Sequence, residues 1–313
     1  KLGKGLPIVL MGDGFIDTEI NDGTYDAVMD KAFENLFTEE PIKSLRDYFN
    51  VYAVTAVSKH NIFGTGYETA LGCELAGGNS TGISGEDNAV QRYVQCVDNI
   101  DMSETLAVVI LNSPAYAGTT YFGYTNQTKV VEFAIAYCPV IYDLQSESFR
   151  QVLVHEAVGH GFAKLEDEYA YQENGTISSK EIKNVQYLQT LGWAQNVDFT
   201  SDPSQVLWSA FLNDNRYVSE KLGVFEGACT YIKGAYRPSE ESMMNSNTEG
   251  VNAPSRKAIY DKIMERSLGK QMSYEEFAVF DLQNKSQTRS AKPTVGPSKP
   301  FTRPHFVNRM LDK

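Results

Sequence analysis

Residues 106–111, LAVVIL, restrict the fold most, because they form an uninterrupted apolar run rich in strand-forming residues. A strand with no polar side is buried on both faces of its sheet, as in parallel sheets covered by helices. The apolar run LPIVLM at residues 6–11 and the β-branched and aromatic stretch at residues 49–58 predict two more strands. The sequence therefore favours a layered α/β domain over a helical bundle or a solvent-exposed antiparallel sheet.

Helical and further strand patterns lie between and after these runs. Residues 24–37 carry apolar side chains at helical spacing on one face, with Thr24 available as a cap. Residues 41–49 and 88–99 predict two more helices, and residues 129–140 another strand. Residues 115–126, AYAGTTYFGYTN, read as a loop or an edge strand. This order predicts an α/β (α+β) fold with a twisted, mostly parallel sheet covered by helices.

The second half of the chain is less regular. We predict one domain over residues 1–283, with the sheet and its helices ending at about residue 163 and a loop-rich part after it. Helices return at residues 256–266 and 273–281, and residues 284–313 form an extended Pro/Ser/Lys-rich tail. Residues 60–87 form a long glycine-rich loop, a type of segment that is often functional.

Composition excludes several classes of function. The net charge is −12, from 28 basic and 40 acidic residues, and no basic cluster indicates a nucleic-acid partner. No apolar stretch approaches the roughly 20 residues of a membrane helix. The four cysteines are far apart and form no C-x-x-C pair, which leaves open one or two disulfides or four buried free thiols. P-loop, dinucleotide and serine-hydrolase motifs are absent from the sequence.

The segment VLVHEAVGHGF places His155, Glu156 and His160 close together in the sequence. Ser148 and Gln151 fit a capping box, so a helix is expected to begin there. The two histidines are five positions apart, which in a regular α-helix puts them about 140° apart and unable to share an ion. A π-bulge, closed by an i→i+5 bond, would bring both to one face, and such bulges occur mostly at functional sites.

A catalytic zinc site needs a third protein ligand and one open position for water. Gly161 is expected to end the helix, so that the short segment after it returns Asp167 to the metal, with Glu166 and Glu168 as alternatives. Glu156 would then deprotonate the water. Two histidines and several acids on a surface helix are common without a metal. The cap, the glycine and the returning acid together favour a Zn²⁺ site.

Residues 155–169, HEAVGHGFAKLEDEY, resemble the active-site signature of the IgA-peptidase family of metalloendopeptidases. The usual signature is H-E-x-G-H followed by a Leu-x-Asp-Glu-Tyr ending, which matches Leu165, Asp167, Glu168 and Tyr169. Similar segments extend over about residues 7–265, among them MGDGF, VVILN and YRPSEESMMN. The extra residue departs from the family pattern, but H-E-x-x-G-H is known from zinc peptidases of the dipeptidyl peptidase III type.

The resemblance implies a zincin fold of the metzincin kind, with a methionine turn under the metal at Met244. Tyr236 is a candidate for stabilising the oxyanion, although an aromatic residue near a proline commonly serves packing. Asp13, in the GDG turn, is expected to cap that turn rather than bind a cation.

We expect a secreted, monomeric zinc endopeptidase that acts on a protein or peptide lying along a sheet edge near residues 121–126. The alternatives are a non-catalytic protein- or glycan-binding module with a degenerate site and a zinc exopeptidase.

Overall fold

The computed structural model describes residues 3–76, 82–122, 131–285 and 305–306. Its contacts divide the chain into two compact units. The first contains residues 1–37, 46–162 and 293–313, and the second contains residues 38–45 and 163–292. The predicted tail beyond residue 285 lies outside the described residues except for positions 305 and 306.

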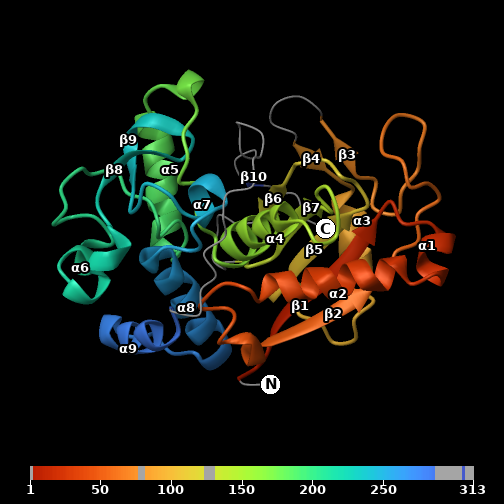
Figure 1. Ribbon diagram of the computed structural model, residues 1–313, viewed down its shortest axis with the longest axis horizontal. Helices are drawn as coiled ribbons and strands as arrows, with labels where there is room; N and C mark the ends of the chain where they lie inside the picture. Colours follow the sequence, from red (N-terminus) through yellow and green to blue (C-terminus); the bar gives the residue numbers. More distant parts are fainter. Residues whose placement is uncertain (1–2, 77–81, 123–130, 286–304, 307–313) are drawn as a thin grey trace. The chain divides into compact units, whose positions relative to one another are not determined.

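A six-stranded sheet forms the centre of the first unit (Figure 1). Its order is β10-β6-β7-β5-β1-β2. β2, β1, β5 and β7 are parallel neighbours, β6 runs antiparallel to β7, and β10 runs parallel to β6. The strands are β1 (Leu6–Asp13), β2 (Phe49–Val54), β5 (Leu106–Leu111), β6 (Thr119–Phe122), β7 (Ala134–Pro139) and β10 (His305–Phe306). The predicted α/β class with a mostly parallel sheet is confirmed.

Helices cover both faces of this sheet, which explains the apolar central strands. On one face, α2 (Thr24–Leu36) contacts β1 and β5, while α4 (Glu147–Leu153) and the helix η3 (Val154–Phe162) contact β7. On the other face, Val90 and Val94 of α3 (Asp87–Val94) pack with Val109 and Ile135. Every residue of β5 and β7 is buried as a result. The remaining elements of this unit are α1 (Asp17–Asn21), η1 (Arg46–Tyr48), β3 (Glu74–Leu75), β4 (Ile83–Ser84) and η2 (Met102–Glu104).

The helix predicted over residues 41–49 is wrong. These residues form turns followed by the short 3₁₀ helix η1. The Glu40 carboxylate accepts hydrogen bonds from the Ser44 amide at 3.3 Å and the Ser44 hydroxyl at 3.0 Å. Such local side-chain bonds compete with helical ones and favour turns. The helix predicted over residues 88–99 is shorter than expected and ends at Val94.

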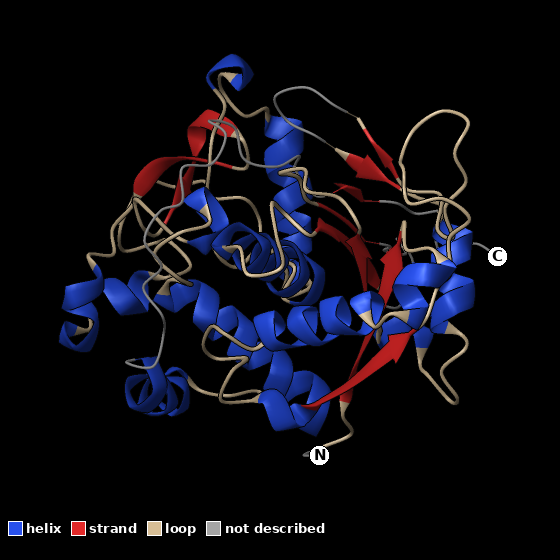
Figure 2. Cartoon of the chain, turned by 45° about the vertical axis from the view of Figure 1, so that its right-hand side comes forward, coloured by secondary structure: helices blue, strands red, loops and turns tan. Residues whose placement is uncertain are grey.

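The second unit contains helices, a small antiparallel sheet and much loop (tan in Figure 2). The two helices predicted near its end are confirmed as α8 and α9, and α5 is an addition that the sequence analysis missed. Its elements are η4 (Gln172–Asn174), α5 (Ser179–Thr190), α6 (Ser209–Leu212), η5 (Asn215–Glu220), β8 (Phe225–Ala228), β9 (Tyr231–Arg237), α7 (Met243–Ser246), α8 (Ala253–Leu268) and α9 (Tyr274–Asn284).

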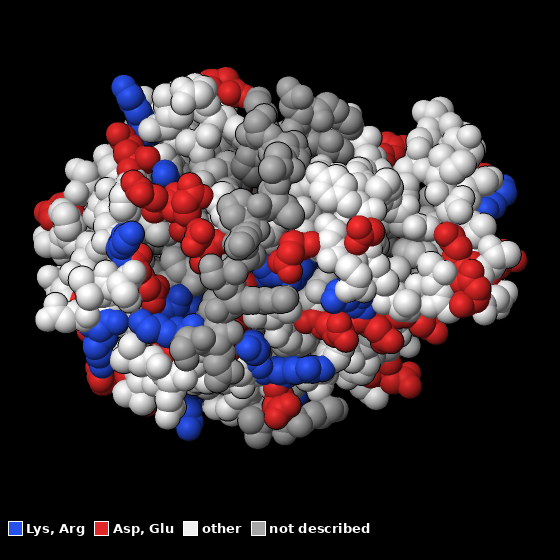
Figure 3. Space-filling view, viewed as in Figure 1, with Lys and Arg blue, Asp and Glu red and all other residues white. Residues whose placement is uncertain are grey.

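Three expectations from composition can be compared with the described residues. No helix among them is long and apolar enough to span a membrane. All four cysteines are described and are free in the structure, with Cys96 exposed and the other three buried. The third expectation concerns the distribution of charge: acidic and basic side chains are interspersed on the face shown in Figure 3.

Candidate metal centre

The N-cap of the helix that carries both histidines lies two residues earlier than predicted. Ser146, not Ser148, is the N-cap, and its hydroxyl accepts a 3.1 Å hydrogen bond from the Ser148 amide. α4 then continues without a break into η3, which is a π-helix over nine residues, Val154–Phe162. The predicted wide winding is therefore confirmed, and it extends over the whole motif instead of one turn.

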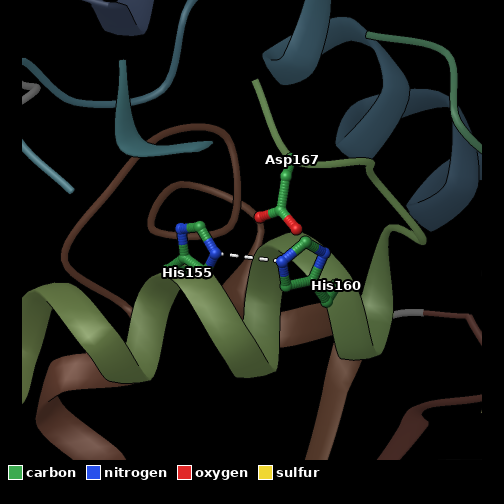
Figure 4. A group of neighbouring side chains, drawn as sticks. All are labelled: His155, His160 and Asp167. Atoms are coloured by element: carbon green, nitrogen blue, oxygen red, sulfur yellow. Dashed lines mark hydrogen bonds between the residues drawn. The ribbon is translucent and has the colours of Figure 1, made fainter. Parts of the chain in front are cut away.

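The π-helix brings His155 and His160 to the same face. Their Nε2 atoms lie 2.9 Å apart and their ring centroids 4.6 Å apart. Asp167, from the segment after the helix, points its carboxylate toward both rings (Figure 4). One ligand atom from each of the three residues lies within 4.8 Å of the others, and all three residues are fully buried. The predicted ligand group is thus assembled.

Gly161 has a different role from the one predicted. The helix does not end there but continues to Phe162, and the left-handed backbone conformation occurs at Lys164, with φ 57°. A Cβ atom on Gly161 would lie 2.6 Å from Leu106 Cδ1 and 3.2 Å from the Glu156 carbonyl oxygen. Glycine is therefore needed for the close approach of the helix to β5, while Lys164 starts the return of the chain.

The three residues fit a zinc ion in type and spacing. Two neutral imidazoles and one carboxylate are a common donor set for catalytic zinc, which keeps the fourth position for water. With bonds of about 2.0–2.1 Å and tetrahedral angles, two zinc-bound nitrogens lie about 3.3 Å apart. The Nε2 atoms, at 2.9 Å, would separate only slightly to admit the ion.

The backbone on both sides of Asp167 is held by neighbouring segments. The Cys229 amide donates to the Asp167 carbonyl at 2.9 Å, and the Thr230 amide donates to the Tyr169 carbonyl at 3.0 Å. Cys229 and Thr230 link β8 to β9 and both have positive φ, 52° and 69°, as a type I′ hairpin turn requires. Non-glycine residues rarely adopt this conformation, so the turn depends on its partners.

Glu168 is not a ligand candidate in the structure, because its carboxylate has other partners. Ser242 Oγ donates to Oε2 at 2.6 Å, Asn196 Nδ2 to Oε1 at 2.9 Å, and Asn252 Nδ2 to Oε2 at 2.8 Å. Ser255 Oγ completes the set at 3.2 Å. Burial raises the pKa of Glu168, and these hydrogen bonds act against that increase.

Glu166 also lies outside the ligand group among the described residues. Its backbone amide donates to Asn196 Oδ1 at 2.9 Å, and Asn196 Nδ2 donates back to its carbonyl at 2.8 Å. Asn196 thereby bonds the segment before and after Asp167. Sequence reasoning missed this asparagine, and nothing in the sequence near position 196 indicates its partner.

Met244 and Tyr236, the candidates for the methionine turn and the oxyanion, both lie in the second unit. Met244 is buried in α7, and its carbonyl accepts a 2.8 Å hydrogen bond from the Glu168 amide, one residue after Asp167. Tyr236 is half-buried in β9 and exchanges two backbone hydrogen bonds with Asp198. Arg237, beside it, donates to the carbonyl oxygens of Glu226, Gly227 and Ser239.

Asp13 was expected to cap the GDG turn, but its carboxylate bonds segments that lie farther along the chain. Its carboxylate accepts hydrogen bonds from the hydroxyls of Ser58 and Thr69 and from the amides of Leu71 and Cys73, at 2.8–3.2 Å. These four donors satisfy both oxygens and hold the start of the glycine-rich loop against the end of β1.

Glu156, the predicted base, is fully buried beside β6. Thr120 Oγ1 lies 2.6 Å from Glu156 Oε2. On β7, burial raises the pKa of the Cys138 thiol, and the nearby charge of Glu156 adds to this increase. Sequence reasoning did not find Thr120, because only the pairing of β6 in the sheet brings it to the helix.

Comparison with known proteins identifies the family. The model of the family described as IgA Peptidase M64 matches residues 3–219, which is more than half of the chain. The chain belongs to the IgA peptidase M64 family. Its resemblance to this family, inferred from the motif, is confirmed. Among the matched residues are both histidines, Glu156 and Asp167, so the assembled ligand group lies within the peptidase part of this M64 chain.

Other comparisons add little to the M64 assignment. A search of curated proteins finds no significant match. Among solved structures, a metalloproteinase-II from Bacteroides fragilis is similar, with 16% sequence identity and a TM-score of 0.28. The similarity covers 52% of this chain and 43% of the length of that protein.

Proposed function

We propose that this M64 chain is a zinc-dependent endopeptidase. In this proposal, His155 Nε2, His160 Nε2 and a carboxylate oxygen of Asp167 hold Zn²⁺. The observation that supports it is the π-helix, which turns two histidines five residues apart toward one another and toward Asp167. A π-helix is rare and occurs mostly at functional sites.

Zn²⁺ held by three protein ligands polarises a peptide carbonyl and lowers the pKa of its water to about 7. The Glu156 carboxylate accepts the proton of the attacking water and later delivers it to the nitrogen of the leaving amine. The Tyr236 hydroxyl donates a hydrogen bond to the carbonyl oxygen of the scissile bond. Met244 would supply the methionine turn of this type of site, and its carbonyl, which accepts from the Glu168 amide, supports the segment that carries Asp167.

The substrate in this proposal is a protein or peptide that lies extended along the sheet edge near residues 121–126. Residues 123–126 are outside the described residues. At Tyr121 and Phe122 the outer edge of β6 is paired with His305 and Phe306, so a substrate strand would replace that pairing. A secreted location and a monomeric state remain part of the proposal.

Metal analysis of protein purified without added zinc tests the proposal directly. We expect about one zinc per chain, lost in His155→Ala and retained in His60→Ala. His60 is a matched control, because its ring lies outside the ligand group and accepts from the Glu68 amide. Absence of zinc in the wild type, or full occupancy in His155→Ala, would support a non-catalytic binding module instead.

Cleavage assays decide the type of activity. An endopeptidase cleaves internally quenched peptides whose two ends are blocked, and a chelator stops the cleavage. Glu156→Gln should keep the zinc and lose at least about a hundredfold in kcat, because it removes the base but no ligand. Cleavage that requires a free terminus would support an exopeptidase instead.

A further inference from the structure

Strand β6 borders the side chain of Glu156 on two sides. Gly118 immediately precedes the strand and Thr120 is its second residue, so both face the same side of the sheet. Thr120 Oγ1 lies 2.6 Å from Glu156 Oε2 and 3.0 Å from the Glu156 carbonyl oxygen. Thr120 therefore contacts both the side chain and the backbone of the predicted base.

Gly118 leaves the space that the carboxylate occupies. A Cβ atom at this position would lie 2.7 Å from Glu156 Oε1 and 2.8 Å from Glu156 Cγ. Such distances are too short for non-bonded carbon and oxygen atoms, so any other residue would push the Glu156 side chain away. The Gly118 backbone thus limits the space around Oε1, and the Thr120 hydroxyl bonds Oε2.

The short contact fixes the direction of the hydrogen bond. A threonine hydroxyl has one proton, and an ionised carboxylate can only accept. A separation of 2.6 Å is typical of a charge-assisted O–H···O⁻ bond, so Thr120 donates to Oε2. Thr120 and Glu156 are both fully buried, where little water competes for this bond.

We propose that Thr120 is a positioning residue that holds the Glu156 carboxylate in the orientation required for proton transfer. This inference rests on the proposed function, since it assigns a role relative to the base of that reaction. A general base has to lie within hydrogen-bond reach of the proton that it takes, and a misplacement of about 1 Å can cost a hundredfold in rate. Thr120 ties that placement to the sheet.

The neighbouring Thr119 provides a matched control. It is also fully buried in β6, but its hydroxyl donates to the Gly118 carbonyl at 2.7 Å and accepts from the Ile83 amide at 2.9 Å. Thr120→Val and Thr119→Val both remove one buried hydroxyl without a change of shape. Only the first removes the bond to Glu156.

Steady-state kinetics and zinc affinity of these variants test the role of Thr120. We expect Thr120→Val to lower kcat about 10- to 100-fold, with KM and zinc affinity within about twofold of the wild type. Thr119→Val should keep kcat within about threefold, and Thr120→Ser, which restores the hydroxyl, should recover most of the lost rate. Equal kcat values for the two valine variants would overturn the proposal.

A stability cycle gives a readout that does not need activity. The melting temperature is measured for Thr120→Val, for Glu156→Ala and for the double variant. The shift caused by Thr120→Val should be smaller in the Glu156→Ala background, whereas Thr119→Val should cause the same shift in both. If Thr120→Val shifts the melting temperature equally in the wild-type and Glu156→Ala backgrounds, the contact between Thr120 and Glu156 is contradicted. A wild type without metal-dependent cleavage would instead refute the proposed function itself.

Discussion

His155 Nε2 and His160 Nε2 lie 2.9 Å apart, although the residues are five positions apart in a helix. In an α-helix the same spacing would direct the rings about 140° apart. Bonds of the i→i+5 type, which define the π-helix, return a residue to the same face after five positions. The two rings can therefore face one another only because η3 is wound as a π-helix.

Removal of the metal should lower thermal stability, because an ion that binds only the folded chain stabilises it. A ligand at a hundred times its Kd contributes about 2.7 kcal/mol, which corresponds to a shift in melting temperature of roughly 4 °C for a chain of 313 residues. Calorimetry with and without a chelator measures the shift. Asp167→Ala should abolish it, and a shift that persists in this variant would contradict the ligand assignment.

Gly161→Ala should destabilise the first unit through overpacking. The new Cβ would lie 2.6 Å from Leu106 Cδ1 and 3.2 Å from the Glu156 carbonyl oxygen, so the Leu106 side chain or the helix has to shift. Such changes cost about 1–3 kcal/mol in the free energy of unfolding. Urea denaturation followed by circular dichroism measures the loss. A variant as stable as the wild type would show that the helix and strand are less closely packed than described.

Glu168→Gln should also lower the free energy of unfolding, by about 1–3 kcal/mol. Its new amide group would face donors from Ser242, Asn196 and Asn252, which now bond the carboxylate. Glu226→Gln is the control, since Glu226 is exposed and belongs to the same unit. The prediction fails if both substitutions change the urea midpoint equally.

We predict a loss of stability at alkaline pH from the buried hydroxyl of Tyr25. Its hydroxyl donates to the Val54 carbonyl at 2.6 Å and accepts from the Gly12 amide at 2.9 Å. Burial raises its pKa from 10.0 to about 12 in the folded chain. Between these values the unfolded chain has lost the proton and the folded chain retains it, so stability falls as pH rises through this range.

The difference of about two pKa units corresponds to about 3 kcal/mol at pH 12 and above. Measurements of unfolding free energy at pH 9 to 12 test the slope. Tyr25→Phe should be less stable at pH 9, because the Gly12 amide loses its acceptor, but its stability should decline less with pH. A slope identical to that of the wild type would assign the alkaline loss to other groups.

Local sequence patterns were enough to predict the helices and strands that have a continuous apolar face. The strands around LAVVIL, the helix over residues 24–36 and the two C-terminal helices follow from hydrophobic period alone. The His-Glu-His spacing was enough to predict the π-winding, because two histidines five positions apart cannot lie on one face of a regular α-helix. The spacing predicts one wide turn, and nothing in the sequence indicates that the winding extends over nine residues.

The parts that sequence did not reveal depend on distant partners. Thr120 meets Glu156 only because β6 pairs antiparallel with β7, and Asn196 meets Glu166 across 30 positions of the chain. At residues 41–48, the bonds of Glu40 to Ser44 overrode a helical pattern with Pro41 in its first turn. Neither the identity nor the spacing of these residues encodes such contacts.

The π-helix also changes what an insertion means in this family. Deletion of one residue between Glu156 and His160 would restore the four-residue spacing, and an ordinary α-helix would then present both histidines on one face. A chain with the extra residue and a π-helix, and a chain without it and an α-helix, can therefore both place the two imidazoles on one face. Relatives with the shorter and the longer motif should accordingly be aligned by their histidines and not by the number of residues between them.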